Sequence, residues 1–231
     1  MPSQIPLPFG KFDRFNFDLY WSGPNQQVVS WLQQTVGSSA ATNIYLWGDH
    51  GTGKSHLLQA ACTLAASRKM QVIYIPLKER AQMSPDILNG MESLDIVCLD
   101  DIDVAAGDVA WEMALFNLFN RLVAEQKTLI TSARTSPGGL PLHLADLKSR
   151  LAAGVIWHLS TLDEKDRLLA LQQRARVRGL ELSDEVIEYL GRRVARDMHS
   201  LFSWLDRLDH ATLVSKKKMT VPFVRELLDK S

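Results

Sequence analysis

Cysteine is scarce in this chain of 231 residues, which contains only Cys62 and Cys98. Each lies within an apolar stretch, where a small buried thiol is the ordinary expectation. Small secreted domains that depend on disulfides have many cysteines at short spacings, so a disulfide framework is excluded. The six histidines show no metal-ligand spacing, and we therefore expect no zinc site.

A charge excess and long apolar runs are absent as well. Lys plus Arg and Asp plus Glu both number 26, so the formal net charge is zero. Domains held to DNA mainly by phosphate neutralisation have a clear basic excess, which argues against that class but not against a partner bound to DNA. The chain shows neither a membrane-length apolar run nor a signal-peptide pattern, and we expect a cytoplasmic protein without membrane contact.

What is present is the alternation of strand and helix patterns in a chain of ordinary globular composition, 46% apolar and 23% charged. The first ten residues hold three prolines and a glycine, which predict an extended tail. Apolar strands are predicted at 44–47, 71–75, 95–99, 128–132 and 155–159. Helices are predicted at 25–36, 54–67, 84–91, 108–125 and in a segment ending near residue 150. This alternation predicts an α/β fold with a five-stranded parallel sheet covered on both faces.

The pattern changes after residue 160, where only helices are expected. They are predicted at 163–178, 183–196, 198–214 and 220–228. We therefore expect a tail at 1–10, an α/β domain at 11–160 and a small all-α domain at 161–231.

A phosphate-binding motif lies between a predicted strand and a predicted helix. Residues 48–55 read GDHGTGKS, which fits G-x-x-x-x-G-K-[ST]. The glycines let backbone N–H groups converge on phosphate oxygens, while the lysine reaches the β- and γ-phosphates and the serine hydroxyl binds Mg²⁺. A glycine-rich turn that binds nothing is the alternative, which the strand and helix on either side disfavour. Nucleotide contacts are expected from Gly48, Asp49, His50, Gly51, Thr52, Gly53, Lys54, Ser55 and His56.

Two carboxylates, Asp100 and Asp101, lie at the end of the apolar strand predicted at 95–99. P-loop proteins place the residue that holds the Mg²⁺ shell at such a strand end. We expect Asp100 on the metal side and Asp101 in position to orient or deprotonate an attacking water. The alternative is a strand end with two solvated acids.

Beyond these two motifs, the chain resembles the AAA+ module of the bacterial replication initiator DnaA. The resemblance covers residues 12–231, and within that family it is closest to the regulatory inactivators homologous to DnaA. It implies an AAA+ fold with a helical lid, and it implies a bound adenine nucleotide, ADP or ATP, with Mg²⁺. We expect a short amino-terminal peptide and no further DNA-binding domain. The segments that carry the resemblance are GDHGTGKSHLLQA (48–60), CLDDID (98–103), WEMALFNLFNRL (111–122), LITSAR (129–134), LADLKSRL (144–151) and VPFVRELL (221–228).

The amino-terminal peptide is similar to the motif by which such inactivators bind the β sliding clamp of DNA polymerase III. Its glutamine amide both donates and accepts hydrogen bonds, its apolar side chains suit a groove, and its prolines keep the strand extended. A tail that folds back on the core is the alternative. The residues expected to bind the clamp are Gln4, Ile5, Leu7, Pro8 and Phe9.

The resemblance also assigns roles to single residues. Arg150, at the end of LADLKSR, matches an arginine that projects toward nucleotide on a neighbouring subunit and stabilises charge on the transferring phosphoryl group. The alternative is a cation favoured by a helix carboxyl terminus. Phe12, Phe15 and Asn25 fall where the family builds its base pocket, although packing explains the aromatic residues there as well.

Two positions depart from the family pattern. Ala133 stands where the first sensor is usually Asp, and His199 stands where a lid arginine normally reaches the phosphates. Histidine is shorter than arginine and only partly charged near pH 7. We therefore expect nucleotide, plausibly ADP, as a structural ligand with poor hydrolysis, and neighbouring Arg196 is a candidate for the missing cation.

Together these features predict an adaptor that, with the clamp on DNA, promotes hydrolysis of ATP bound to DnaA and so prevents re-initiation of replication. Its partners would be DnaA, the β sliding clamp and, through the clamp, DNA. An autonomous AAA+ ATPase such as a helicase loader is the first rival, and a DNA-binding initiator paralogue is the second. The sequence leaves the oligomeric state open, a homo-oligomer included.

Overall fold

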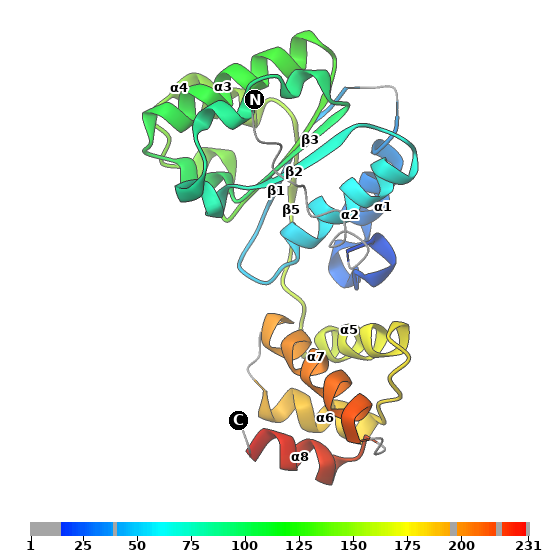
Figure 1. Cartoon of the computed structure of the whole chain (residues 1–231). Coiled ribbons are helices and arrows are strands. Elements are labelled where there is room, and N and C mark those ends of the chain that lie inside the picture. Colours follow the sequence, from blue (N-terminus) through cyan, green and yellow to red (C-terminus); the bar gives the residue numbers. More distant parts are fainter. Residues whose placement is uncertain (1–14, 39–40, 195–197, 216–218, 230–231) are drawn as a thin grey trace. The chain divides into compact units, whose positions relative to one another are not determined.

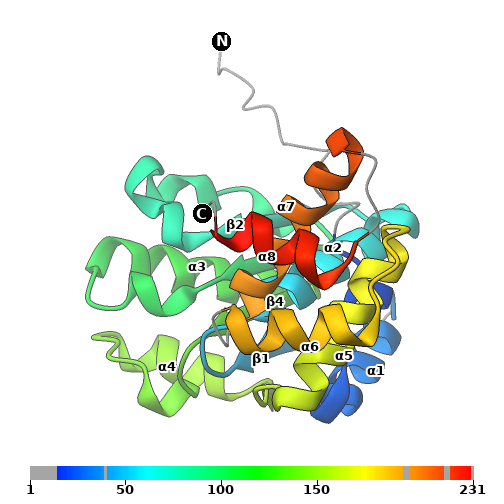
Figure 2. The ribbon, with the colours of Figure 1, turned by 90° about the horizontal axis from the view of Figure 1, so that it is seen from below.

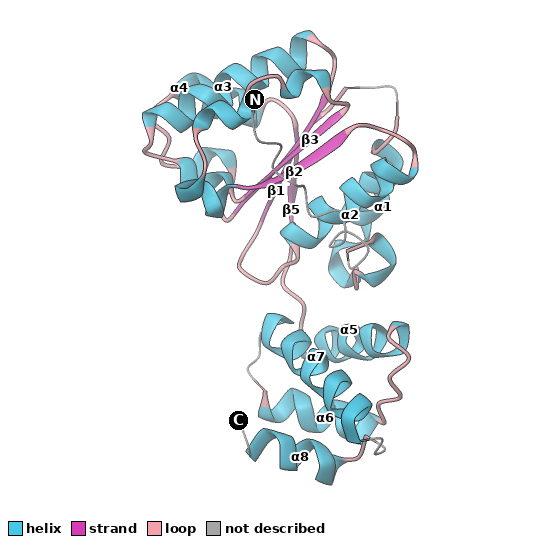
Figure 3. Ribbon diagram, viewed as in Figure 1, coloured by secondary structure: helices cyan, strands magenta, loops and turns pink. Residues whose placement is uncertain are grey.

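The computed structural model describes residues 15–229 except 39–40, 195–197 and 216–218. The chain forms two compact units, one ending at Thr161 and the other beginning at Leu162. Strands occur only in the first unit of the described chain, whereas the second consists of helices and loops, as the colouring in Figure 3 shows. Within the described residues, no helix is both long and apolar enough to cross a bilayer.

The first unit is built on a five-stranded parallel sheet, as predicted. Its strands are β1 (Asn43–Trp47), β2 (Val72–Pro76), β3 (Ile96–Asp100), β4 (Thr128–Ala133) and β5 (Val155–His158). The spatial order is β2-β3-β4-β1-β5, so β4 separates the strand before the glycine-rich motif from the strand that ends in Asp100. Parallel strands end at one edge, and this edge therefore collects the loops that follow β1, β3 and β4.

Helices cover both faces of this sheet (Figure 1). They are α1 (Gln26–Thr35) and α2 (Lys54–Ser67) on one face, and α3 (Val109–Ala124) and α4 (Ala145–Ala152) on the other. Because neighbouring residues of a strand point to opposite faces, Ile96 and Cys98 pack with the α1 and α2 side while Val97 and Leu99 pack with the α3 side. Both cysteines are buried free thiols, as expected.

The predicted helix over 84–91 is confirmed only in part, since a short 3₁₀ helix begins at Pro85 but ends at Leu88. The segment forms two short 3₁₀ turns, Pro85–Leu88 and Met91–Ser93, and not an α-helix. Gly90 lies between them with φ +80°, a left-handed conformation that breaks helical continuity. Elsewhere the helices and strands lie within a few residues of the predicted bounds; the largest difference is the second lid helix, which ends at Arg193 and not at residue 196.

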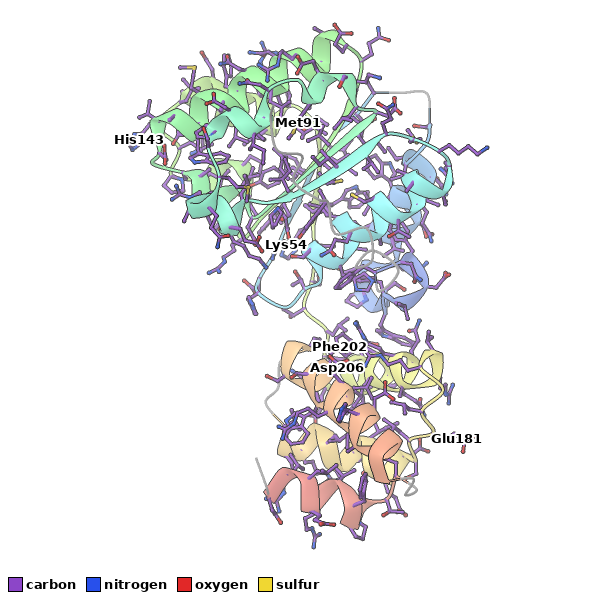
Figure 4. All side chains as sticks on the ribbon, in the orientation of Figure 1. Lys54, Met91, His143, Glu181, Phe202 and Asp206 are labelled. Carbon is purple, nitrogen blue, oxygen red and sulfur yellow. The ribbon has the colours of Figure 1, made fainter. Side chains whose placement is uncertain are left out.

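The second unit contains four described helices: α5 (Glu164–Val177), α6 (Asp184–Arg193), α7 (Met198–Ser215) and α8 (Val221–Asp229). Asp163 and Ser183 cap the amino ends of α5 and α6 through their side-chain oxygens. An apolar core joins the helices, and the Arg174 guanidinium lies 4.1 Å from the ring centre of Phe202, which Figure 4 labels on α7. The unit therefore has its own core.

Candidate functional site

The glycine-rich loop follows β1 and opens α2, as the motif requires. A side chain at Gly48 would place its Cβ 2.5 Å from the backbone oxygen of Leu159, and one at Gly53 would place it 2.5 Å from the Tyr20 ring. Gly51 and Gly53 have φ of +83° and +87°, which L side chains rarely adopt. Glycine is thus required both for space and for backbone conformation, and the resulting loop wraps the amino end of α2.

Lys54 is nearly fully buried at the start of α2, where Figure 4 labels it. Its Nζ donates hydrogen bonds to the carbonyl oxygens of Gly48, at 2.6 Å, and Asp49, at 2.8 Å. Burial lowers the pKa of Lys54, although the carboxylates of Asp101 and Asp100 oppose that shift. An ammonium has three donors, so one remains for a phosphate oxygen while the other two hold the loop.

Asp100 is the last residue of β3 and is completely buried. One carboxylate oxygen accepts a 2.7 Å hydrogen bond from the Tyr74 hydroxyl on β2, and the other accepts a hydrogen bond from the Ser132 hydroxyl on β4. A buried carboxylate needs such donors, since burying a charge without them is costly. Asp100 is therefore fixed by both neighbouring strands, and it is not the solvated acid of the alternative reading.

Asp101 follows with φ +58°, an unusual left-handed conformation for a residue with a side chain. Its N–H donates to the Ser132 hydroxyl at 3.0 Å, so one serine fixes both carboxylate residues. Burial raises the pKa of Asp101, and the negative charges of Asp100 and Asp103 raise it further. A carboxylate with a raised pKa is a better base for water than an ordinary one, which suits the predicted role of Asp101.

Residues before α1 pack against the glycine-rich loop and α2. The Tyr20 hydroxyl donates to the Thr52 carbonyl oxygen at 2.9 Å, and buried Asn25 exchanges hydrogen bonds with the backbone of Ser160. His56 lies with its Nε2 2.8 Å from the Asn16 carbonyl oxygen and its ring edge-on to Phe15. The side chain of His56 thus packs against the amino-terminal segment.

Arg150 lies in the last turn of α4 and is exposed. Its carbonyl oxygen accepts a 3.2 Å hydrogen bond from the side-chain amide of Asn43. Among the described residues its guanidinium has no ion pair or hydrogen bond. Arg150 is therefore an exposed cation whose charge no described residue of the chain neutralises.

Several predicted residues cannot be placed. Arg196, Phe12 and the whole peptide Gln4, Ile5, Leu7, Pro8 and Phe9 lie outside the described residues, as does the side chain of His199. Ala133 ends β4 and is fully buried beside Trp47 of β1 in the sheet register.

The geometry of the glycine-rich loop and the neighbouring strand ends fits the phosphates of a nucleotide. The loop conformation, the buried lysine and the two carboxylates meet at one edge of the sheet, which matches the needs of a phosphate chain. In the described part of the chain, no group of three or more His, Cys, Asp or Glu is arranged so that it could hold a metal ion. Mg²⁺ in phosphate sites uses only one or two carboxylates together with phosphates and water, and Ser55 and Asp100 are the residues that would hold it here.

Sequence reasoning missed the residues that hold this edge together, namely Tyr20, Tyr74 and Ser132. Each lies outside both the glycine-rich motif and the carboxylate pair along the chain. Only the apolar context of Ser132, in a strand that is buried along its whole length, signals that its hydroxyl needs a buried partner.

Comparison with protein families assigns both units. The model described as the bacterial DnaA ATPase domain matches residues 12–158, and the model described as Hda, lid domain, matches residues 163–228.

Solved structures agree with this assignment. AMPPCP-bound DnaA from Aquifex aeolicus has 25% sequence identity and a TM-score of 0.73, with 84% of this chain and 65% of that one covered. Domain III of the Thermotoga maritima replication initiation protein DnaA is 21% identical, with a TM-score of 0.79 over 93% of this chain and 95% of that one. The Thermotoga maritima RuvB branch migration motor has the same fold at 16% identity, with a TM-score of 0.67 over 93% of this chain and 73% of that one. The chain thus spans about two thirds of the nucleotide-bound DnaA structure. It belongs to the DnaA family of AAA+ proteins, with a lid of the Hda type.

Proposed function

We propose that this chain is an adaptor that switches off DnaA by promoting hydrolysis of DnaA-bound ATP. In this proposal the β sliding clamp on DNA holds the adaptor through residues 4–9, and Arg150 reaches the triphosphate on DnaA. The adaptor thereby converts the initiator to its ADP form after replication begins. The membership in the DnaA family and the Hda-type lid support a regulator of this kind.

The observation that carries the proposal is the contrast between Arg150 and its helix. The backbone of α4 is fixed, through Leu147 and Leu151 in the core and through the bond from Asn43, while the guanidinium is exposed without a described partner. A cation that only complements a helix dipole needs no such support, since that effect is worth about 0.3–1 kcal/mol at the surface. A fixed arginine that completes another subunit's phosphoryl-transfer site gains about 10³–10⁵ in rate.

The chain's own site is proposed to bind adenine nucleotide, with ADP as a structural ligand. The loop 48–55 would hold the phosphates through backbone N–H groups and Lys54, and bound Mg²⁺ would neutralise phosphate charge beside Ser55 and Asp100. Ala133 offers no polar side chain at the end of β4, and His199 replaces a lid arginine. These two residues support weak hydrolysis by the chain itself.

An autonomous ATPase is the second candidate, and one observation favours it. Lys54, Asp100 and Asp101 all lie at the same edge of the sheet, and the raised pKa of Asp101 suits a general base. Steady ATP turnover by the isolated protein that is lost in Asp101→Asn would support this reading. Absence of turnover, with retained ADP binding, would support the adaptor.

Phosphate release from ATP-loaded DnaA, measured with the chain and DNA-loaded clamp, tests the adaptor directly. We expect stimulation that is lost in Arg150→Ala and after removal of residues 1–9. Arg192→Ala is the matched control, because Arg192 is an exposed helical arginine whose ion pair with Glu188 links neighbours on one helix. Stimulation that persists in both Arg150→Ala and the truncated chain would refute the proposal.

A further inference from the structure

Glu112 is a buried carboxylate that has no part in the nucleotide site or in the role proposed for Arg150. It lies in the first turn of α3 and is 1% exposed. Its Oε1 accepts from the N–H groups of Gly107, at 2.8 Å, and His143, at 3.1 Å, and its Oε2 accepts from the N–H of Leu144 at 2.7 Å. Burial by itself raises the pKa of Glu112, but these three N–H groups outweigh it and lower the pKa below its usual value.

The three N–H groups belong to two separate segments. Gly107 lies in the turn that follows the carboxylate pair and the 3₁₀ turn Ile102–Ala105, just before α3 begins. His143 and Leu144 end the loop that leads into α4, and no side chain of its own caps the amino end of that helix. One carboxylate therefore joins the loop after β3 to the beginning of the helix that carries Arg150.

Other contacts fix the body and the carboxyl end of α4. Leu147 and Leu151 are buried in the core beside α3, and α3 and α4 lie side by side in both views (Figures 1 and 2). At the carboxyl end, Asn43 donates to the carbonyl oxygen of Arg150, and a side chain at Gly154 would clash with Asn43, its Cβ 2.3 Å from the backbone oxygen. An eight-residue helix with anchors at both ends has little freedom to shift or rotate.

A charge at this place is not needed for packing alone. Replacing a buried ionic group with apolar residues of similar volume is often neutral or stabilising, so a buried carboxylate is weak evidence for a purely structural role. Its strong, directional bonds to N–H groups instead define where the attached backbone lies. Fixing the backbone of α4 in this way also positions Arg150, which the helix carries.

We propose that Glu112 is a positioning residue for Arg150, since its carboxylate fixes the amino end of α4 to α3 and to the loop after Asp101. This inference rests on the proposed function, in which Arg150 acts on ATP held by DnaA. Because Arg150 must reach a phosphoryl group at a defined distance, loss of this anchor weakens the rate of hydrolysis more than it weakens association. A displacement of about 1 Å at a reacting group reduces a rate by about 10²-fold.

The test compares Glu112→Gln with Arg150→Ala in the phosphate-release assay with ATP-loaded DnaA and DNA-loaded clamp. Glutamine keeps the shape but has only one acceptor oxygen, and its amide nitrogen faces an N–H group. We expect the maximal stimulated rate to fall about 10- to 100-fold, with the concentration for half-maximal stimulation and the ADP affinity of the chain each changed less than about 3-fold. The control is Glu125→Gln, an exposed glutamate just after α3, with no expected change.

Hydrogen exchange by mass spectrometry gives a second readout that does not depend on DnaA. In Glu112→Gln the amides of residues 143–150 should exchange at least about 10-fold faster than in the wild type, while those of α2 keep their rates. Unchanged exchange at 143–150, or full stimulation by Glu112→Gln where Arg150→Ala abolishes it, would overturn the role of Glu112 alone. Full stimulation by Arg150→Ala would instead contradict the role of Arg150 in the proposed function, on which this inference rests.

Discussion

Replacing Ser132 with alanine removes the one hydroxyl that fixes both carboxylate residues at the edge of the sheet. In the wild type this hydroxyl donates to Asp100 and accepts from the N–H of Asp101. Both groups remain in the variant, but each loses a partner. The serine and Asp100 are both completely buried, so water has little access to replace the missing bond.

The expected loss of stability follows from these two contacts. A hydrogen bond to a charged group contributes about 1.5–3 kcal/mol, and a buried donor left without an acceptor loses about 1–3 kcal/mol. Asp101 is only partly buried, which puts its N–H at the low end of that range. Tyr74 still donates to Asp100, so the carboxylate keeps one strong bond. We expect Ser132→Ala to lower the free energy of unfolding of the first unit by about 2–4 kcal/mol.

Urea unfolding followed by tryptophan fluorescence measures this loss, since all but one of the six tryptophans lie in the first unit. Ser67→Ala is the matched control, because Ser67 is exposed and its hydroxyl donates only to the Leu64 carbonyl within the same helix. We expect the control to stay within about 0.5 kcal/mol of the wild type. A loss below about 0.5 kcal/mol in Ser132→Ala would show that the hydroxyl does not support a buried charge at Asp100.

Three further predictions concern the loop and the buried glutamate. Lys54→Ala should weaken ADP binding, measured by titration calorimetry, about 10- to 100-fold because a charge-assisted hydrogen bond is lost. An unchanged affinity would show that ADP does not bind at Lys54. Gly51→Ala and Gly53→Ala should each lower the free energy of unfolding by about 1 kcal/mol, because alanine rarely adopts a positive φ. Gly53→Ala should lower it by about 1–3 kcal/mol more, because its Cβ would clash with Tyr20. Equal melting temperatures of the two variants would contradict the clash. The lowered pKa of Glu112 means that its charge stabilises the fold fully above its unfolded value of about 4.3 and progressively less as the pH falls through the folded value. The stability difference between wild type and Glu112→Gln should therefore be constant above about pH 5 and shrink below about pH 4 in urea titrations, and a difference that grows with acid would contradict the sign.

Local patterns predicted much of the fold. Short apolar runs, each followed by a helical period, were sufficient to locate all five strands and the four helices α1 to α4, because strand and helix periodicity is written in neighbouring residues. The segment 84–91 departs from its prediction because the first turn ends at Leu88, where Asn89 is extended and Gly90 takes a left-handed conformation. These two residues separate the segment into two short 3₁₀ turns.

The contacts at the site could be predicted less well from the sequence. The glycine spacing around Lys54 predicted the loop because the motif is contiguous and each glycine has a local backbone reason. The partners of Asp100 come from β2 and β4, and only the spatial order of the strands brings Tyr74 and Ser132 to it. Glu112 lies among apolar residues of α3, and the helical periodicity of that segment fits an exposed glutamate equally well. Its burial could therefore not be predicted from the sequence of the helix.

The place of β1 between β4 and β5 has a consequence for how this protein is made. β1 pairs only with β4 and β5, so the pairing of Asn43 with Leu129 cannot form until Leu129 has been synthesised. At ordinary ribosomal speeds of about 5–20 residues per second, that interval is about 4–17 s. During this interval the backbone of β1 lacks both of its strand partners, so the sheet edge that carries the glycine-rich loop is incomplete. A chaperone that shields β1 during these seconds would protect the newborn chain when it is most prone to aggregate.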